Sequence, residues 1–151
     1  MRLTNMSDYA VRLLIYLSGH RDRLCTIAEI ARAYDISEPH LMKITHRLAQ
    51  RGWIRTVRGK NGGMALAHEP DDIRLGDLIR DMENDLTLVE CMGTDNHCIL
   101  SGRCGLTAIV TKALQAFMDT LNAHTLADVL PLSSPSSQGK APAVVHARRR
   151  A

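Results

Sequence analysis

The feature that most constrains the fold is a pair of short helical patterns joined by a tight turn. Thr26 and Glu29 form a capping box that begins the first pattern, and Ser37 followed by Pro39 begins the second. The second pattern continues to about Arg51, with one apolar and one polar side. Two short helices in this order predict a helix-turn-helix, whose second helix enters the major groove of DNA.

Directly after Gly52 the helical period gives way to an alternation of apolar and polar residues. Residues 53–58 and 64–67 predict two strands, because alternation is the period of a half-buried strand. The connection, residues 59–63, is rich in Gly and Asn, which accept the positive φ of a tight hairpin. A hairpin in this place predicts a winged helix, with Trp53 as the packing anchor between the wing and the helices.

Three further segments have helical periodicity. They predict a first helix from Thr4 to about His20, a fourth over residues 73–82 and a long one over about 105–123. The low aromatic content, 3% beside 45% hydrophobic residues, also favours helices over a β-sandwich. The apolar stripe of the long helix is wider than a small winged helix can bury, so it predicts pairing with a partner helix.

The expected fold is therefore mainly α with a small β-hairpin wing: a winged helix-turn-helix plus a long dimerisation helix. We assign residues 1–70 to a DNA-binding domain, 71–130 to a cysteine loop and the dimerisation helix, and 131–151 to a disordered tail. Residues 1–70 hold eleven Lys and Arg against six Asp and Glu, a balance of +5, whereas 71–130 hold four against ten, a balance of −6. This asymmetry predicts that a polyanion meets the first half only.

The sequence also predicts a cytoplasmic location without membrane contact. No stretch approaches the ~20 consecutive apolar residues that cross a bilayer. The first residues lack a signal-peptide pattern, since Asp8 interrupts them and no cleavage site follows. In the cytoplasm, free thiols or metal ligands are expected in place of disulfides.

Three cysteines, Cys91, Cys98 and Cys104, lie in a polar, glycine-containing segment between the fourth and the long helix, with the spacing C-x6-C-x5-C. Three soft ligands with one position left open suit a soft metal or an iron–sulfur cluster. The alternatives are incidental thiols or a zinc site completed by His97, but structural zinc sites use shorter C-x2–4-C intervals. Cys25 is expected to be a small core residue.

The DNA contacts are predicted on the recognition helix and the wing. The helix N-terminus meets phosphate, and imidazole and ammonium groups on the outer side of the helix read base edges. A basic side chain near the wing tip enters the minor groove, and its neighbours hold the DNA backbone. The alternative is that the polar side of this helix faces solvent and does not bind DNA. The predicted contact residues are Ser37, His40, Lys43, His46, Arg58, Lys60 and Asn61.

Together with the cysteines, several segments resemble the Rrf2 family of bacterial winged-helix regulators, over roughly residues 1–130. Within that family, the chain is most similar to repressors that respond to nitric oxide through an iron–sulfur cluster. The segments that carry the resemblance are Met1-Arg-Leu-Thr4, Ser7-Asp-Tyr-Ala10, Ser37-Glu-Pro-His-Leu-Met-Lys-Ile44, Val57-Arg-Gly-Lys-Asn-Gly-Gly63, Ile73-Arg-Leu-Gly-Asp77 and Thr125-Leu-Ala-Asp-Val129.

The resemblance implies a homodimeric repressor that binds a palindromic operator and releases it when nitric oxide attacks the cluster, whether [4Fe-4S] or [2Fe-2S]. We expect Asp8 to be the fourth cluster ligand, supplied across a dimer interface, with water or Glu90 as alternatives. Glu83, Asp85, Asp95 and His97 are further candidates. A sibling branch that uses a His three residues after the last cysteine is disfavoured, because Thr107 stands there.

Other functions remain as alternatives at this stage. An iron- or redox-responsive regulator of the same family would use the same three cysteines. A small metal or redox protein that does not bind DNA is the alternative from a different class. An enzyme is not expected, because the sequence has no nucleophile–base motif, phosphate-binding glycine loop or cofactor fingerprint.

Overall fold

The computed structural model describes residues 2–131, so all of the predicted tail except Pro131 lies outside the described residues. Its elements follow the predicted order, with each helix boundary within two residues of expectation. They are α1 (Asn5–Ser18), α2 (Ile27–Tyr34), α3 (Glu38–Gln50), β1 (Ile54–Val57), β2 (Gly63–Leu66), α4 (Leu75–Met82) and α5 (Leu106–Asn122), with short 3-10 turns η1 (Pro70–Asp72), η2 (Glu90–Met92) and η3 (Ala127–Val129).

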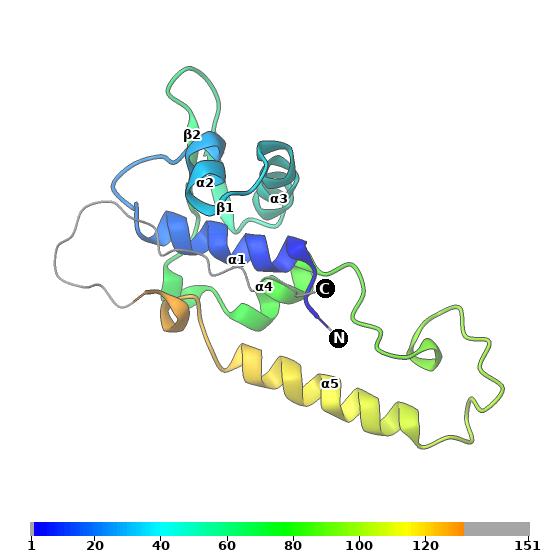
Figure 1. The fold of residues 1–151 in the computed structure, drawn as a ribbon. Coiled ribbons are helices and arrows are strands. Elements are labelled where there is room, and N and C mark those ends of the chain that lie inside the picture. Colours follow the sequence, from blue (N-terminus) through cyan, green and yellow to red (C-terminus); the bar gives the residue numbers. More distant parts are fainter. Residues whose placement is uncertain (1, 132–151) are drawn as a thin grey trace, which may run out of the picture.

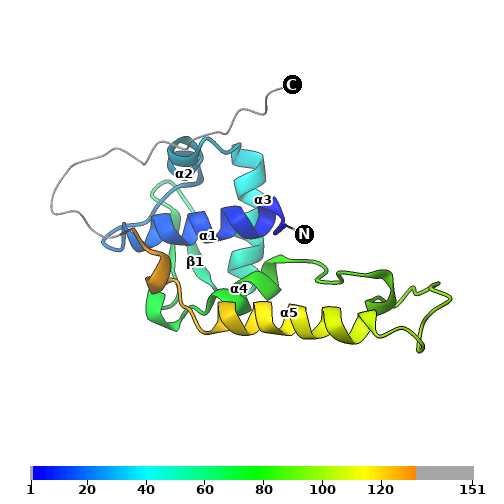
Figure 2. The same cartoon turned by 60° about the horizontal axis from the view of Figure 1, so that its bottom comes forward.

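The elements form a packed body with a long arm (Figure 1). Helices α1, α2 and α3 and the β1–β2 hairpin make up the body, and α4 lies between α1 and α5. The segment between α4 and α5 runs out from the body, and helix α5 returns beside it, as the turned view also shows (Figure 2). Within residues 2–131, no helix has the length and apolar character needed to cross a membrane.

The predicted winged helix is confirmed. Strands β1 and β2 pair antiparallel, with Ile54 opposite Leu66. Cys25 adds a short bridge on the other side of β2: its N–H donates to the Met64 carbonyl at 2.9 Å and its carbonyl accepts from Met64 at 2.8 Å. A Cβ on Gly63 would lie only 2.7 Å from the Cys25 carbonyl oxygen, so this close approach requires glycine.

The core is aliphatic, as the composition predicted. The inner side of α3 contributes Leu41, Ile44 and Leu48, all buried against apolar side chains of α1 and α2. Ile73 and Leu78 from the second half of the chain belong to the same cluster. Cys25 is fully buried in it, which confirms the prediction of a core residue.

Burial raises the pKa of the Cys25 thiol to about 11, with a smaller contribution from its hydrogen bond with Glu29. The thiol therefore stays protonated at neutral pH and is a poor nucleophile. The Thr26 capping box beside it is confirmed, because the Thr26 hydroxyl accepts from the Glu29 N–H at 3.3 Å.

The start of α1 differs from the sequence prediction in its chemistry. Thr4 occupies the N-cap position, but its hydroxyl donates to Glu83 Oε1 at 3.1 Å in place of capping its own helix. The Thr4 N–H and the buried Ser7 hydroxyl donate to the same oxygen, at 2.8 and 2.6 Å. A carboxylate at a helix N-terminus complements the partial positive charge there, so Glu83 caps α1 from the end of α4.

Helices α4 and α5 approach each other closely at Gly76. An added Cβ there would lie 2.0 Å from Asn122 Oδ1, and this oxygen is buried without a hydrogen-bond partner among the described residues. Backbone bonds join the same region, since the Leu126 N–H donates to the Ile73 carbonyl at 2.8 Å. This contact fixes the direction of α5 relative to the body.

Candidate functional site

Helix α3 presents a polar outer side opposite its buried one. Lys43 and His46 are exposed on it, and Ser37 is exposed at the N-cap position. His40 is half-buried, and its ring packs edge-to-face on Tyr9 of α1 with centroids 5.1 Å apart. The contact orients the His40 ring, so α1 helps to set the shape of this surface.

Arg47 corrects the simple view of α3 as a row of exposed cations. Unlike exposed Lys43, Arg47 turns its guanidinium to the end of α4. Nε donates to the Asp81 carbonyl at 2.8 Å, Nη1 to Asn84 Oδ1 at 2.7 Å and Nη2 to the Glu83 carbonyl at 3.3 Å. The physical reason is that carbonyls at a helix C-terminus lack intrahelical donors and attract cations.

The wing extends from the body with its tip exposed. Arg58, Lys60 and Asn61 are all exposed there, and Figure 1 shows the tip and α3 at the same end of the body. Gly59 has φ 115°, and a Cβ on Gly62 would stand 2.2 Å from the Val57 carbonyl oxygen. The glycines therefore permit the tight turn that holds the two basic side chains at the tip.

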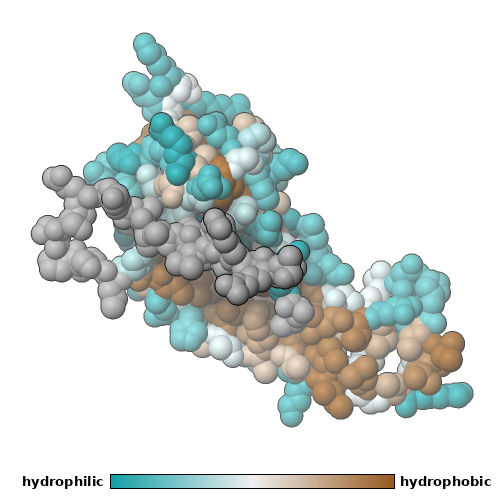
Figure 3. Space-filling model, in the orientation of Figure 1, coloured by the Kyte–Doolittle hydropathy of each residue, from teal (hydrophilic) through white to brown (hydrophobic). Residues whose placement is uncertain are grey.

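The body and the arm differ in surface character (Figure 3). The end with α3 and the wing is mostly hydrophilic, whereas apolar residues gather along α5 and the adjoining segment. Ile109 on α5 is 68% exposed, and Leu106 is exposed beside it. An apolar groove of about 680 Å³ runs beside α5, and Val110, Leu114 and Phe117 line it. Unpaired apolar surface of this kind marks an interaction site.

The three predicted cluster ligands lie in the segment between α4 and α5, residues 83–105, which we call the cysteine loop. Cys91 is in η2, Cys98 directly precedes a turn and Cys104 stands just before α5. Cys91 Sγ lies 2.9 Å from Thr107 Oγ1, and the Leu106 N–H points to Cys104 Sγ at 3.4 Å. Two of the thiols therefore contact the first turn of α5.

All four cysteines are free thiols in the described chain, and the donor set of the loop suits a soft metal or an iron–sulfur cluster. However, residues 2–131 contain no preassembled group of three or more His, Cys, Asp or Glu side chains that could hold a metal ion. The chemistry of the donors fits such a group, and bringing the three thiols together requires the loop to close.

Asp8 lies on α1 and is half-exposed, where its carboxylate pairs with Arg12 one turn later at 2.8 Å. The structure does not bring it together with the cysteines of its own chain. Its expected role is ligation across a dimer interface, which a single chain does not test, so this role stays a prediction.

The other fourth-ligand candidates have local partners. Glu83 is buried and accepts from Thr4 and Ser7, and Glu90 Oε1 accepts from the His97 N–H at 2.9 Å. Asp95 pairs with the His97 ring at 2.9 Å. The Thr87 side chain and N–H hold the pKa of Asp85 below its usual value. These contacts shape the cysteine loop and the end of α4.

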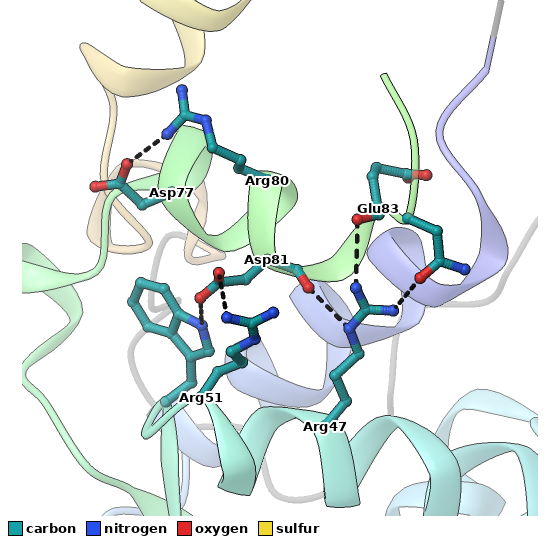
Figure 4. Close-up of polar contacts among 8 residues, drawn as sticks. Arg47, Arg51, Asp77, Arg80, Asp81 and Glu83 are labelled. Atoms are coloured by element: carbon teal, nitrogen blue, oxygen red, sulfur yellow. Dashed lines mark hydrogen bonds and ion pairs between the residues drawn. The ribbon is translucent and has the colours of Figure 1, made fainter. Parts of the chain in front are cut away.

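Sequence reasoning missed a cluster at the end of α4, which we call the α4 junction: Asp81, Glu83 and Asn84. The Trp53 indole N–H donates to Asp81 Oδ2 at 2.9 Å, and Arg51 approaches Asp81 Oδ1 at 3.7 Å (Figure 4). This confirms Trp53 as the anchor of the wing and adds a polar bond. No periodic signal marks such long-range contacts, because they join residues that are distant in sequence.

Comparison with known proteins decides the family. The model of Rrf2, described as an iron-dependent transcriptional regulator, matches residues 3–131. The chain belongs to the Rrf2 family. It is 46% identical over 132 residues to the HTH-type transcriptional regulator NsrR of Bacillus licheniformis, covering 86% of this chain and 92% of that protein. It is 42% identical to NsrR of Bacillus subtilis, covering 86% and 90%.

Among solved structures, the fold is similar to T. potens IscR, with a TM-score of 0.68, 27% identity and 85% of each chain covered. The winged-helix architecture is therefore that of the Rrf2 regulators. Membership in this family and the named relatives make the chain a transcriptional regulator. The similarity covers α3, the wing, the cysteine loop and α5 together, so it extends over both the body and the arm.

Proposed function

We propose that the chain is a cytoplasmic homodimeric repressor that senses nitric oxide through an iron–sulfur cluster and releases operator DNA when the cluster is nitrosylated or lost. The observation that carries the proposal is the placement of three free thiols between α4 and α5 of an Rrf2 winged helix. Neither part alone would support it, because winged helices without cysteines and cysteine loops without DNA-binding surfaces serve other functions.

The DNA-binding part of the proposal rests on α3 and the wing. Exposed Lys43 and His46, with the oriented His40 ring, read base edges in the major groove. Arg58 enters the adjacent minor groove. The remaining predicted contacts, made by Ser37, Lys60 and Asn61, position the protein on phosphates and carry little sequence information.

The dimer part rests on the arm. The exposed apolar side of α5 and the groove beside it are the surfaces that a second copy would cover in a symmetric dimer. Pairing through α5 would place two recognition helices on one face of a palindromic duplex, about one helical turn apart. The spacing of the two α3 helices then depends on how α5 is held against the body.

For the cofactor, Cys91, Cys98 and Cys104 would hold the cluster, with Asp8 of the partner subunit as the fourth ligand. When bound, a [4Fe-4S] or [2Fe-2S] cluster supplies iron that reacts with nitric oxide. The chain's own contribution is to close the loop by its thiolates and to connect it to α5, which Cys91 and Cys104 already contact. Loss of ligation frees the loop, and the α5 spacing that the operator needs is lost.

The deciding experiment is an anaerobic visible spectrum of the purified protein titrated with nitric oxide, with duplex binding followed by fluorescence anisotropy in the same samples. Thiolate-to-iron absorption that bleaches together with release of the duplex is the expected result. A protein that stays colourless after anaerobic reconstitution would falsify the proposal and leave a DNA binder with a zinc or thiol switch.

The fourth ligand has its own test. An Asp8→Ala protein should show an altered cluster spectrum and faster bleaching by nitric oxide. Arg12→Gln is the matched control, because it breaks the Asp8–Arg12 pair but keeps the carboxylate. An Asp8→Ala protein with an unchanged spectrum and unchanged nitric oxide response would assign the position to water or Glu90.

An iron-responsive regulator is the second candidate, favoured by the description of the family as iron-dependent. The two differ in the signal, so we compare release of the duplex by nitric oxide with release after iron chelation. A metal or redox protein that does not bind DNA is excluded if binding to a palindromic duplex falls steeply as salt rises.

A further inference from the structure

The α4 junction connects three parts of the molecule that are distant in sequence. Each of its residues contacts a different element: Asp81 bonds Trp53 at the start of the wing, Glu83 caps α1, and Asn84 accepts from Arg47 on α3. Figure 4 shows the Arg47 and Arg51 side chains reaching the end of α4. The same stretch of chain then continues into the cysteine loop.

Arg47 holds this junction through the backbone as well as through side chains. It donates to the carbonyls of Asp81 and Glu83, at 2.8 and 3.3 Å, and to the Asn84 side chain at 2.7 Å. A single planar guanidinium therefore fixes the direction of the chain at the residues where α4 ends and the loop begins. Any displacement of residues 83–84 changes the geometry of the two bonds to Glu83 and Asn84 together.

The opposite end of this connection is the recognition helix. Arg47 is one residue from exposed His46 and on the same helix as Lys43. Two turns earlier on the same side of α3, the His40 ring packs on Tyr9 of α1, and the Thr4 N–H at the start of α1 donates to Glu83. The loop-side end of α4 therefore reaches the DNA-facing side of α3 by two routes, one through Arg47 and one through α1.

We infer that Arg47 is the positioning residue that couples the state of the cysteine loop to the orientation of the recognition helix. The inference deepens the proposed function and rests on it. In this arrangement a closed loop holds residues 83–84 where Arg47 can make its three bonds. A released loop lets this segment move, and α3 loses a support that sets its angle on the body.

The test compares Arg47→Gln with wild type by the ratio of duplex dissociation constants without and with the cluster. We expect the ratio to shrink by roughly twofold to thirtyfold, the range of a residue that carries coupling. The cluster spectrum and its bleaching by nitric oxide should stay as in wild type. Arg51→Gln is the matched control, because it removes the same charge from the end of α3. Within residues 2–131, the Arg51 guanidinium pairs with the Asp81 side chain and makes none of the backbone bonds of Arg47.

A second readout does not depend on the cluster. In the apo-protein, Arg47→Gln should speed hydrogen exchange at the Glu83 N–H, which bonds the Ile79 carbonyl at 2.9 Å, and at the Thr4 N–H, whose acceptor is Glu83. Asn84→Ala keeps the backbone acceptors and should produce a smaller change of the same kind. Asn84→Ala also takes the place of Arg47→Gln in this test if Arg47→Gln does not fold.

The outcomes separate the two proposals. A wild-type protein whose duplex binding is the same with and without the cluster overturns both. A wild-type ratio that Arg47→Gln leaves unchanged, together with unchanged exchange at Glu83 and Thr4, overturns the role of Arg47 alone. If Arg47→Gln and Arg51→Gln reduce the ratio of dissociation constants equally, the effect comes from the lost charge alone. That result also overturns the role of Arg47.

Discussion

The body and the cysteine loop of this protein are held together in different ways. In the body, side chains such as Leu14 of α1 and Leu48 of α3 are fully buried and come from helices distant in sequence. In the loop, hydrogen bonds join near neighbours, for example the Cys98 N–H to Asn96 Oδ1 at 3.0 Å, and Ile99 is 94% exposed. The body is stabilised by burial, whereas the loop follows the chain's local turns.

The difference separates a rigid body, which carries α3 and the wing, from a loop that is held by few long-range contacts. Segments with few buried apolar contacts open at low free energy, so a ligand can reshape them without unfolding the rest. The loop begins at the α4 junction and ends at the first turn of α5, so its two ends contact two different helices. Four predictions test the contrast, from the largest expected effect to the smallest.

The largest effect is expected from truncating the core. Leu48→Ala should lower the free energy of unfolding by about 2–5 kcal/mol, because it leaves a cavity among packed aliphatic side chains. Ile99→Ala in the loop should change it by less than about 0.5 kcal/mol. Urea denaturation followed by circular dichroism measures both. Equal losses would show that the loop is part of the cooperative core.

Glycine positions provide the next contrast. Gly76→Ala should destabilise the protein by about 1–3 kcal/mol, since the new Cβ overlaps Asn122 where α4 meets α5. Gly105→Ala at the end of the loop is the control, because an added Cβ there meets no atom of the described residues within 4 Å. The comparison uses the midpoints of thermal unfolding. A tolerated Gly76→Ala would mean that α5 can shift relative to α4.

Thiol reactivity should separate the two regions without any mutation. In the cluster-free protein, Cys91, Cys98 and Cys104 should be alkylated by iodoacetamide well before Cys25, because burial keeps the Cys25 thiol protonated. Mass spectrometry of peptides from timed samples gives the order. Early labelling of Cys25 would contradict its place in the core. Denatured protein, in which all four thiols react, is the control.

The smallest effect concerns alkaline pH. The Cys25 pKa rises from 9.0 to about 11 on folding, so the unfolded chain loses its thiol proton first. The contribution of the Cys25 thiol to the free energy of unfolding is fully present below pH ~9 and is lost as the pH rises towards ~11. Between pH ~9 and ~11, the free energy of unfolding of Cys25→Ala should therefore decrease less steeply with pH than that of wild type. If the free energy of unfolding has the same pH dependence in both proteins, Cys25 does not contribute to it.

Sequence periodicity was sufficient for the elements of the body. The Thr26 capping box, the Pro39 start of α3 and the glycines of the wing are local signals, and each is read within a few residues. The cysteine triplet was visible for the same reason. The arrangement of its thiols was not, because loop conformation depends on many weak contacts without a period.

By itself, the sequence determined the winged helix, the long apolar helix and the three thiols between them. Only the tertiary structure decided that Arg47 turns from the outer side of α3 to the end of α4, and that Glu83 caps α1. Both contacts arise because helix ends leave backbone groups without partners, and only the packed body brings a charged side chain of the right sign within reach. Local patterns specify which helices form, and packing specifies which helix ends meet.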